Sequence, residues 1–293
     1  MGLRRIATVE LPSGGSYDPA DVHLRSGRVH LANTALDQVE VLDGPGASHL
    51  ASIAGCAGAS GVLAVGEAMV AAARGSGEVL VLDGATAQLL RRFPVGPAPN
   101  GLAWDPDRAQ LLVADTSEHT ARLVDLGGSA IATVALPGRP RWAVHDACSG
   151  HFHVNVKDPA GVIALDAVEL ATVGWFPLEA VGPHGLGLDT ERGVLLVACD
   201  DASLRFVDPS SGHERHAVAL AGEPDVVFVD ARRASAHVCV GDPPTLHVID
   251  LDDRAMREVI TTGAGAKTAA LDAERGRFYA FLPAAGQAWV YGL

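Results

Sequence analysis

The amino-acid sequence predicts an all-β fold, a seven-bladed β-propeller of four-stranded blades whose ring is closed by the N-terminal strand. Three observations predict it: a repeat of about 42 residues, a four-strand pattern inside each repeat, and a spare strand at the N-terminus. The composition agrees, because 33 glycines and 17 prolines suit short strands joined by tight turns. We therefore expect a single domain over residues 1–293.

The repeat is seen in a short apolar string that ends in aspartate and returns along the chain. The strings VEVLD, VLVLD, ARLVD, VIALD, LRFVD and LHVID end at Asp43, Asp83, Asp125, Asp166, Asp208 and Asp250. Successive copies lie 40 to 42 residues apart, and AWVYG places Gly292 another 42 residues on. Such spacing defines a structural unit. We interpret the aspartates as caps of the turn before each outer strand.

Each repeat contains four strand patterns. A first strand such as GLGLD is followed by a turn rich in Pro, Asp, Arg and Gly, and then by a second strand such as VLLVA. The string that ends in aspartate is the third strand, and a segment such as HERHAVAL is the fourth. Four antiparallel strands make one blade. The predicted blades are 17–58, 59–99, 100–140, 141–183, 184–224, 225–266, and 267–293 together with 1–12.

The two ends of the chain complement one another. The last repeat, which begins at Lys267, supplies three strands, and RRIATVEL near the N-terminus has the pattern of a fourth strand without a repeat of its own. We expect this segment to complete the last blade, since closure of the ring removes an exposed sheet edge.

Charge and cysteine usage narrow the classes of partner. The formal charge of −13 opposes binding to the phosphate backbone of nucleic acids. The basic clusters are no longer than pairs such as Arg91-Arg92, so no basic patch offsets this charge. The four cysteines have no C-x-x-C spacing, so we expect neither a zinc site nor a disulfide framework, and Cys199 and Cys239 fall in apolar strands.

The opening MGLRRIATVEL has no apolar stretch long enough for a signal peptide or a membrane span. We expect a cytoplasmic monomer, or a periplasmic one if a leader precedes this start.

Two resemblances extend this interpretation. The segments PHGLGLDTERGVLLVACDD (183–201) and EPDVVFVDARRASAHVCVGD (223–242) resemble YVTN-repeat propellers, a resemblance that implies seven blades but no single function. The segment PNGLAWDPDRAQLLVADT (99–116) resembles gluconolactonase-like propellers, which hold a divalent metal through an asparagine that would match Asn100. That pattern also requires an early glutamate and a second asparagine. This chain shows no channel glutamate, and it carries Arg141 in the blade after Asn100.

The candidate site is a ring of residues at one mouth of the channel. First strands line the channel of a propeller, so the residue that opens each of them is expected to face the mouth. Alignment on the strand-ending aspartates predicts a ring of Ser60, Asn100, Arg141, His184, Asp225 and Lys267, with Asp21 or Ala20 in the first blade.

The ring allows three interpretations. In the first, the cationic Arg141, His184 and Lys267, with Asp225 and Asn100, bind a small anionic molecule or a protein partner. In the second, Asn100, His184 and Asp225 hold Ca, Mn or Mg in a lactonase-like hydrolase, which is the only cofactor that the sequence suggests. In the third, these side chains pair across a water-filled channel. No local catalytic motif decides whether the protein is an enzyme.

Other histidines are weaker candidates. His145 stands where other repeats have Leu or Val, so we expect it in the core. His151 and His153 share one strand face, which core packing or an exposed face explains better than a metal does. His213 and His216 lie in a turn and an outer strand and are expected on the surface.

Overall fold

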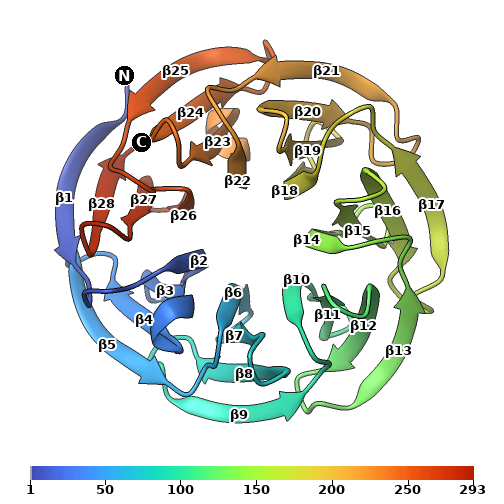
Figure 1. Cartoon of the computed structure of the whole chain (residues 1–293), viewed down its shortest axis with the longest axis horizontal. Coiled ribbons are helices and arrows are strands. Elements are labelled where there is room, and N and C mark those ends of the chain that lie inside the picture. The colour runs from blue at the N-terminus through green and yellow to red at the C-terminus, as the bar shows by residue number, and fades with distance from the viewer. Residues whose placement is uncertain (1) are drawn as a thin grey trace.

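The computed structural model describes residues 2–293, and across them the chain forms seven four-stranded antiparallel sheets arranged as blades around a channel (Figure 1). The first strand of each blade lines the channel and the fourth forms the rim. The two short 3-10 turns in this part of the chain are η1 (Thr34–Leu36) and η2 (Ala231–Arg233). The prediction of a seven-bladed, all-β propeller is confirmed. None of the described segments is a helix long and apolar enough to cross a membrane.

The strands fall into four concentric sets. The first strands are β2 (Tyr17–His23), β6 (Ala59–Val65), β10 (Pro99–Asp105), β14 (Pro140–Asp146), β18 (Pro183–Asp189), β22 (Pro224–Asp230) and β26 (Thr268–Asp272). The second strands are β3 (Arg28–Asn33), β7 (Ala68–Ala73), β11 (Gln110–Asp115), β15 (His151–Val156), β19 (Val194–Cys199), β23 (Ser235–Val240) and β27 (Arg277–Leu282). The third strands are β4 (Gln38–Asp43), β8 (Glu78–Asp83), β12 (Thr120–Asp125), β16 (Gly161–Asp166), β20 (Ser203–Val207), β24 (Thr245–Asp250) and β28 (Gln287–Gly292). The fourth strands are β5 (Ser48–Ala54), β9 (Leu89–Pro94), β13 (Ala130–Ala135), β17 (Thr172–Pro177), β21 (Glu214–Ala219), β25 (Ala255–Thr261) and β1 (Arg4–Glu10).

The ring is closed by pairing of the first strand of the chain with the last. Strand β1 runs antiparallel to β28, with Arg4 opposite Gly292 and Glu10 opposite Gln287. Both ends of the chain therefore lie on one blade (Figure 1). The predicted closure by the N-terminal strand is confirmed.

The core lies between the faces of neighbouring blades. Every residue of β19 and β23 is buried, whereas β5 alternates between exposed and partly buried side chains. This gradient follows from the architecture, because inner strands are covered on both faces and rim strands meet solvent. Cys199 and Cys239 are fully buried among apolar neighbours, as their strand context predicts.

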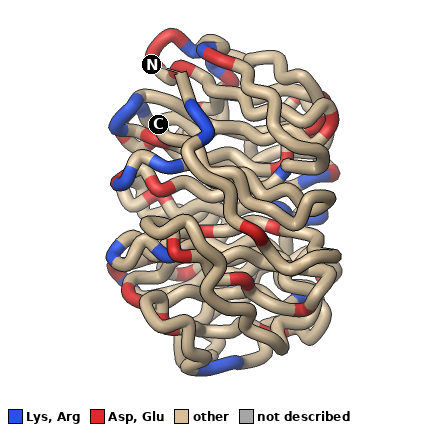
Figure 2. The backbone as a smooth tube through the Cα atoms, turned by 90° about the vertical axis from the view of Figure 1, so that its left-hand side faces the viewer, with Lys and Arg blue, Asp and Glu red and all other residues tan. Residues whose placement is uncertain are grey.

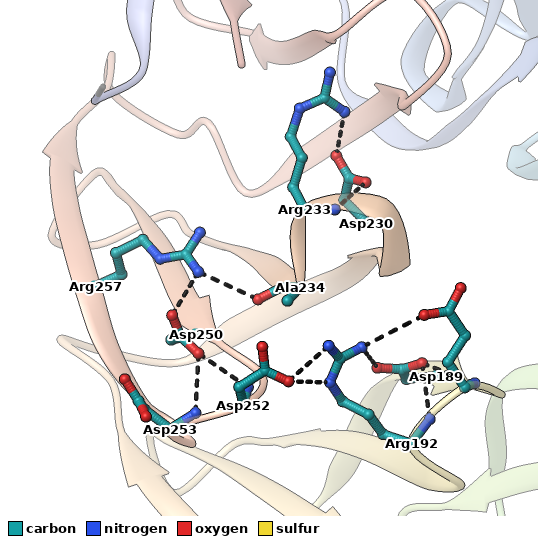
Figure 3. Close-up of polar contacts among 10 residues, drawn as sticks. Asp189, Arg192, Asp230, Arg233, Ala234, Asp250, Asp252, Asp253 and Arg257 are labelled. Atoms are coloured by element: carbon teal, nitrogen blue, oxygen red, sulfur yellow. Dashed lines mark hydrogen bonds and ion pairs between the residues drawn. The ribbon is translucent and has the colours of Figure 1, made fainter.

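The repeated aspartates cap turns at the rim. Asp250 Oδ1 accepts hydrogen bonds from the backbone N–H groups of Asp252 and Asp253, at 2.9 Å each (Figure 3). Equivalent bonds confirm the prediction for Asp83, Asp125, Asp166 and Asp208. It is wrong for Asp43, which is paired in the sheet but whose side-chain carboxylate accepts no hydrogen bond from a backbone N–H of the described residues.

A second set of turns ties neighbouring blades together at the ends of the first strands. Arg192 Nη1 lies 3.0 Å from Asp189 Oδ2 in its own blade, and its Nη2 lies 2.6 Å from Asp252 Oδ1 in the next (Figure 3). Arg233 donates in the same way to the carbonyl of Ala273, at 3.0 Å. The strand-ending aspartates therefore position arginines that link one sheet to the next.

Candidate functional site: a cavity at the channel mouth

A cavity of about 330 Å³ opens where the first strands begin. The residues of the predicted ring lie 40 to 43 positions apart in the sequence. The structure brings all six into the wall of this cavity: Ser60, Asn100, Arg141, His184, Asp225 and Lys267. Each comes from a different blade, at the second residue of its strand in β6, β10, β14, β18 and β22 and one residue before β26 begins.

The first blade contributes Asp18, not Asp21 or Ala20 as the sequence alignment predicted. Asp18 lies five residues before the end of β2 and lines the cavity. Asp21 instead faces the neighbouring blade, where its Oδ2 accepts from the backbone N–H of Ala64 at 2.8 Å, and burial raises its carboxyl pKa. Ala20 is buried in the core. His23 takes the place of the strand-ending aspartate in this blade, as Val65 does in the second blade, where the alignment nevertheless placed Ser60 correctly.

Sequence reasoning missed a second set of charged residues around the mouth. Arg74, Lys157 and Asp200 each follow directly after the second strand of their blade, the strands β7, β15 and β19. The signal was available, because the same repeat alignment applied to the second strands places these three residues at equivalent positions.

The two basic residues of this second set each pair with an acidic side chain at the mouth. Arg74 Nη2 lies 2.9 Å from Asp18 Oδ2, and Arg74 Nη1 donates to Asn100 Oδ1 at 3.4 Å. Lys157 Nζ lies 2.6 Å from Asp200 Oδ2. Burial raises the pKa of Asp18, and the nearby carboxylate of Asp225 raises it further.

His184 lies between two carboxylates. Its Nε2 is 3.1 Å from Asp225 Oδ1, and its Nδ1 is 3.5 Å from Asp200 Oδ1. Burial, followed by the charge of Arg141, lowers the pKa of His184 to about 4, so the imidazole is neutral at pH 7. Burial likewise raises the pKa of Asp225, although Lys267 and Arg141 oppose this shift.

Asn155 fixes the backbone beneath His184. Its side-chain Nδ2, fully buried in β15, donates to the carbonyl oxygens of His184 and Gly185 at 3.1 and 2.9 Å. This contact reaches across from the neighbouring blade to the start of β18. The position of the imidazole therefore depends on a side chain that does not itself line the cavity.

Arg141 is the cation at the mouth that lacks a partner. Its side chain is mostly buried, and its Nε is buried without a hydrogen-bond partner among the described residues. No carboxylate of residues 2–293 lies within 4.0 Å of its guanidinium, and burial lowers its pKa. Three cations, Arg74, Arg141 and Lys267, face two carboxylates, Asp18 and Asp225, across the cavity. With His184 neutral, the cavity carries an excess positive charge in an acidic protein.

The donors proposed for a metal are arranged differently from the expectation. Among the His, Cys, Asp and Glu side chains that the structure describes, one group of three gathers ligand atoms within 4.8 Å: His184, Asp200 and Glu223. Asp225 is not part of this group. The amide oxygen of Asn100 accepts from Arg74, so a cation held by Asn100, His184 and Asp225 would have to displace that arginine.

The remaining histidines lie where the repeat pattern predicts. The side chain of His145 is 5% exposed and its ring centroid lies 4.9 Å from that of Phe152, so it packs in the core. His153 is fully buried, and burial lowers its pKa to about 4. His213 and His216 are exposed on the surface.

Comparison with known proteins defines the class of protein through the fold alone. The chain matches no described protein-family model and no curated protein. Two similar solved structures are a chain of hydrazine synthase from Kuenenia stuttgartiensis and a chain of the mitotic checkpoint complex, each with a TM-score of 0.85 and 13% sequence identity. The first match covers 97% of this chain and 96% of the other, and the second covers 99% and 91%. The resemblance to YVTN-repeat propellers stays a prediction.

Proposed function

We propose that this propeller binds a small anionic molecule, a carboxylate or a phosphate, in the cavity at the channel mouth. The observation that carries the proposal is the unpaired guanidinium of Arg141 in the cavity wall. Arg141 is partly buried, so its unpaired charge is incompletely solvated, and an anionic ligand supplies the missing partner. The planar guanidinium also offers two parallel N–H donors, which match the oxygens of a carboxylate or phosphate.

The other groups in the wall support a ligand of this kind. Lys267 is 55% exposed, and its Nζ lies 3.7 Å from Asp225 Oδ2, so this loose pair can be exchanged for a contact with a ligand at little cost. Trp142, Leu63 and Leu102 add apolar surface beside the charged ring. A cavity of about 330 Å³ lies in the size range of small-molecule pockets.

Calorimetric titration tests the proposal. Phosphate and short-chain carboxylates should bind the wild-type protein, and Arg141→Ala should weaken binding about ten-fold or more, since charge-assisted hydrogen bonds contribute about 1.5–3 kcal/mol. The matched control is Arg232→Ala, because Arg232 is exposed in η2, outside the cavity. Equal binding by wild type and Arg141→Ala would refute the proposal that Arg141 in this cavity binds the anion.

A protein partner is the second form of the same proposal. An acidic side chain presented by a partner would meet Arg141 as a free carboxylate does. Its binding should then be competed by phosphate. Insensitivity to phosphate and to Arg141→Ala would place a protein interface elsewhere on the molecule.

A metal-dependent hydrolase is the other candidate function. The observation in its favour is the convergence of His184, Asp200 and Glu223. Against it, Asp200 already contacts Lys157 at 2.6 Å. Elemental analysis of the purified protein, followed by titration with manganese and calcium, separates this candidate from the anion-binding one. A stoichiometric metal that is lost in Asp200→Asn would favour the hydrolase.

A further inference from the structure

The wall of the cavity contains a buried hydrogen-bond acceptor without a partner, Asp225 Oδ2, as well as a buried donor without a partner among the described residues, Arg141 Nε. Asp225 Oδ2 is buried and has no hydrogen-bond partner among the described residues, and its nearest cation, Lys267 Nζ, lies 3.7 Å away. The side chain of Asp225 is 10% exposed. A hydrogen bond from a donor group on a ligand would therefore stabilise this buried carboxylate oxygen.

Each of the other two carboxylates at the mouth has a cation within 2.9 Å of one of its oxygens. Asp18 Oδ2 accepts from Arg74 at 2.9 Å and from the hydroxyl of Thr34 at 3.3 Å. Asp200 Oδ2 contacts Lys157 at 2.6 Å, and Asp200 does not line the cavity. In the wall of the cavity, Asp225 Oδ2 is therefore the buried carboxylate oxygen that has no hydrogen-bond partner among the described residues.

The unmet donor and the unmet acceptor lie on the same side of the ring. Arg141 belongs to β14 and Asp225 to β22, and the blade between them contributes His184, whose Nε2 contacts the other oxygen of Asp225 at 3.1 Å. Both side chains line the one cavity. A single small molecule can therefore contact both, provided that it carries an anionic group and a donor.

We infer that the ligand is a small carboxylate that also carries a hydrogen-bond donor, a hydroxyl or an ammonium group. Its carboxylate pairs with Arg141 and its donor group binds Asp225 Oδ2. This inference rests on the proposed function and adds to it a requirement for the donor. A site with a buried hydrogen-bonding group discriminates strongly against an analogue that lacks the matching atom, because the buried group is then left unpaired.

Three acids of one carbon skeleton test this requirement: propionate, 2-hydroxypropionate and 2-aminopropionate. Calorimetric titration of the wild-type protein should show that at least one of the two donor-bearing acids binds about ten-fold or more tightly than propionate. A preference for the hydroxy acid or for the amino acid identifies which donor the site accepts.

The variant Asp225→Ala tests whether that preference comes from Asp225. It should bind the three acids within about two-fold of one another, and it should bind propionate and phosphate more tightly than wild type, since a negative charge has left the wall. The control is Asp253→Ala, which removes the same charge from an exposed turn of the same blade and should retain the wild-type preference. Should Asp225→Ala fail to fold, the wild-type series and Asp225→Leu, which also lacks a side-chain acceptor, test the inference.

The outcomes of these titrations distinguish anion binding by the cavity from the additional requirement for a hydrogen-bond donor on the ligand. Equal binding of all three acids by wild type refutes the requirement for a donor and leaves anion binding standing. Absence of binding by these acids and by phosphate refutes both. A preference that persists in Asp225→Ala or in Asp225→Leu assigns the acceptor to another residue and overturns this inference.

Discussion

The guanidinium carbon of Arg5 lies 4.3 Å from the centre of the Trp289 ring, so a cation–π contact joins the first strand of the chain to the last. Around it, Gln287 Nε2 donates to Glu10 Oε1 at 2.9 Å, and the backbone N–H of Leu11 donates to the carbonyl of Gly286 at 2.8 Å. The ring is thus held closed by non-covalent contacts between the two ends of the chain.

Removal of residues 1–12 should therefore lower the melting temperature by about 10 °C or more. The deletion removes the buried side chains of Val9 and Leu11, each of which contributes about 1.5–3 kcal/mol, and exposes the edge of β28. The single change Arg5→Ala should shift the melting temperature by only a few degrees, because a cation–π contact contributes about 0.5–1 kcal/mol. Calorimetric scans of both variants measure the difference. An unchanged melting temperature in the deletion would contradict closure.

Three buried histidines should make the fold sensitive to mild acid. His30, His153 and His237 occupy the third position of β3, β15 and β23, and burial lowers their pKa values to about 3, 4 and 4. Unfolded histidine takes up a proton near pH 6.5, whereas these folded ones stay neutral. The free energy of unfolding should therefore be constant above pH 6.5. It should fall as the pH drops from 6.5 to about 4, by about 1.4 kcal/mol per pH unit for each histidine.

Urea unfolding at pH 7.5, 6.5 and 5.5 measures this slope. His237→Leu places an apolar residue at a position where β11 and β19 also carry leucine, and it should reduce the slope. His216→Ala, at an exposed site, should leave the slope as in wild type. A stability that is flat from pH 7.5 to 5.5 would show that these imidazoles are not held neutral.

Glu40 should be one of the most costly side chains to truncate. It is fully buried in β4, and its carboxylate accepts hydrogen bonds from four side chains: Asn33, Gln38, His49 and Ser52, at 2.6 to 2.9 Å. Glu40→Ala leaves these donors without an acceptor, so the free energy of unfolding should fall by about 2–4 kcal/mol.

Chemical denaturation of Glu40→Ala is compared with that of Glu67→Ala. The carboxylate of Glu67 pairs with Arg25 at 2.9 Å but is 72% exposed, so its removal should cost less than about 1 kcal/mol. Similar losses in the two variants would show that burial of Glu40 adds nothing to stability.

The protein should not retard duplex or single-stranded DNA at about 0.15 M salt. Its charge of −13 opposes the release of counterions that drives such binding. Basic and acidic residues interleave on the side of the disc shown in Figure 2 rather than forming a continuous basic surface. Gel-shift assays at micromolar protein, with and without added salt, measure this directly. A salt-dependent shift would reveal a basic face that the charge distribution does not suggest.

The fold could be predicted from the sequence because its signals are local and repeated. The strand-ending residues Asp105, Asp189 and Asp230 each precede a tight turn, and their spacing reveals the blades and the ring together. In the first blade, where His23 stands in place of that aspartate, the prediction was Asp21 or Ala20 and the structure has Asp18. The second blade also lacks the aspartate, at Val65, and its ring residue Ser60 was predicted correctly.

The pairing at the site could not be predicted in the same way. Arg74 contacts both Asp18 and Asn100, which lie in the blades on either side of its own, and nothing in the repeat indicates which partner a long side chain reaches. Arg141 has the same place in its blade as His184 and Asp225, yet it alone of the three lacks a charged partner within the described residues. Only the arrangement in space reveals that difference.

The seven-fold placement of the site has a consequence for how such a protein can change. Each side chain of the ring belongs to a separate blade, and none of the seven is part of the apolar clusters that hold the blades together. A substitution at Lys267, whose side chain is 55% exposed, can thus alter what the cavity recognises without changing the apolar core. New specificity can then arise one residue at a time in the course of evolution, with that core kept intact at every step.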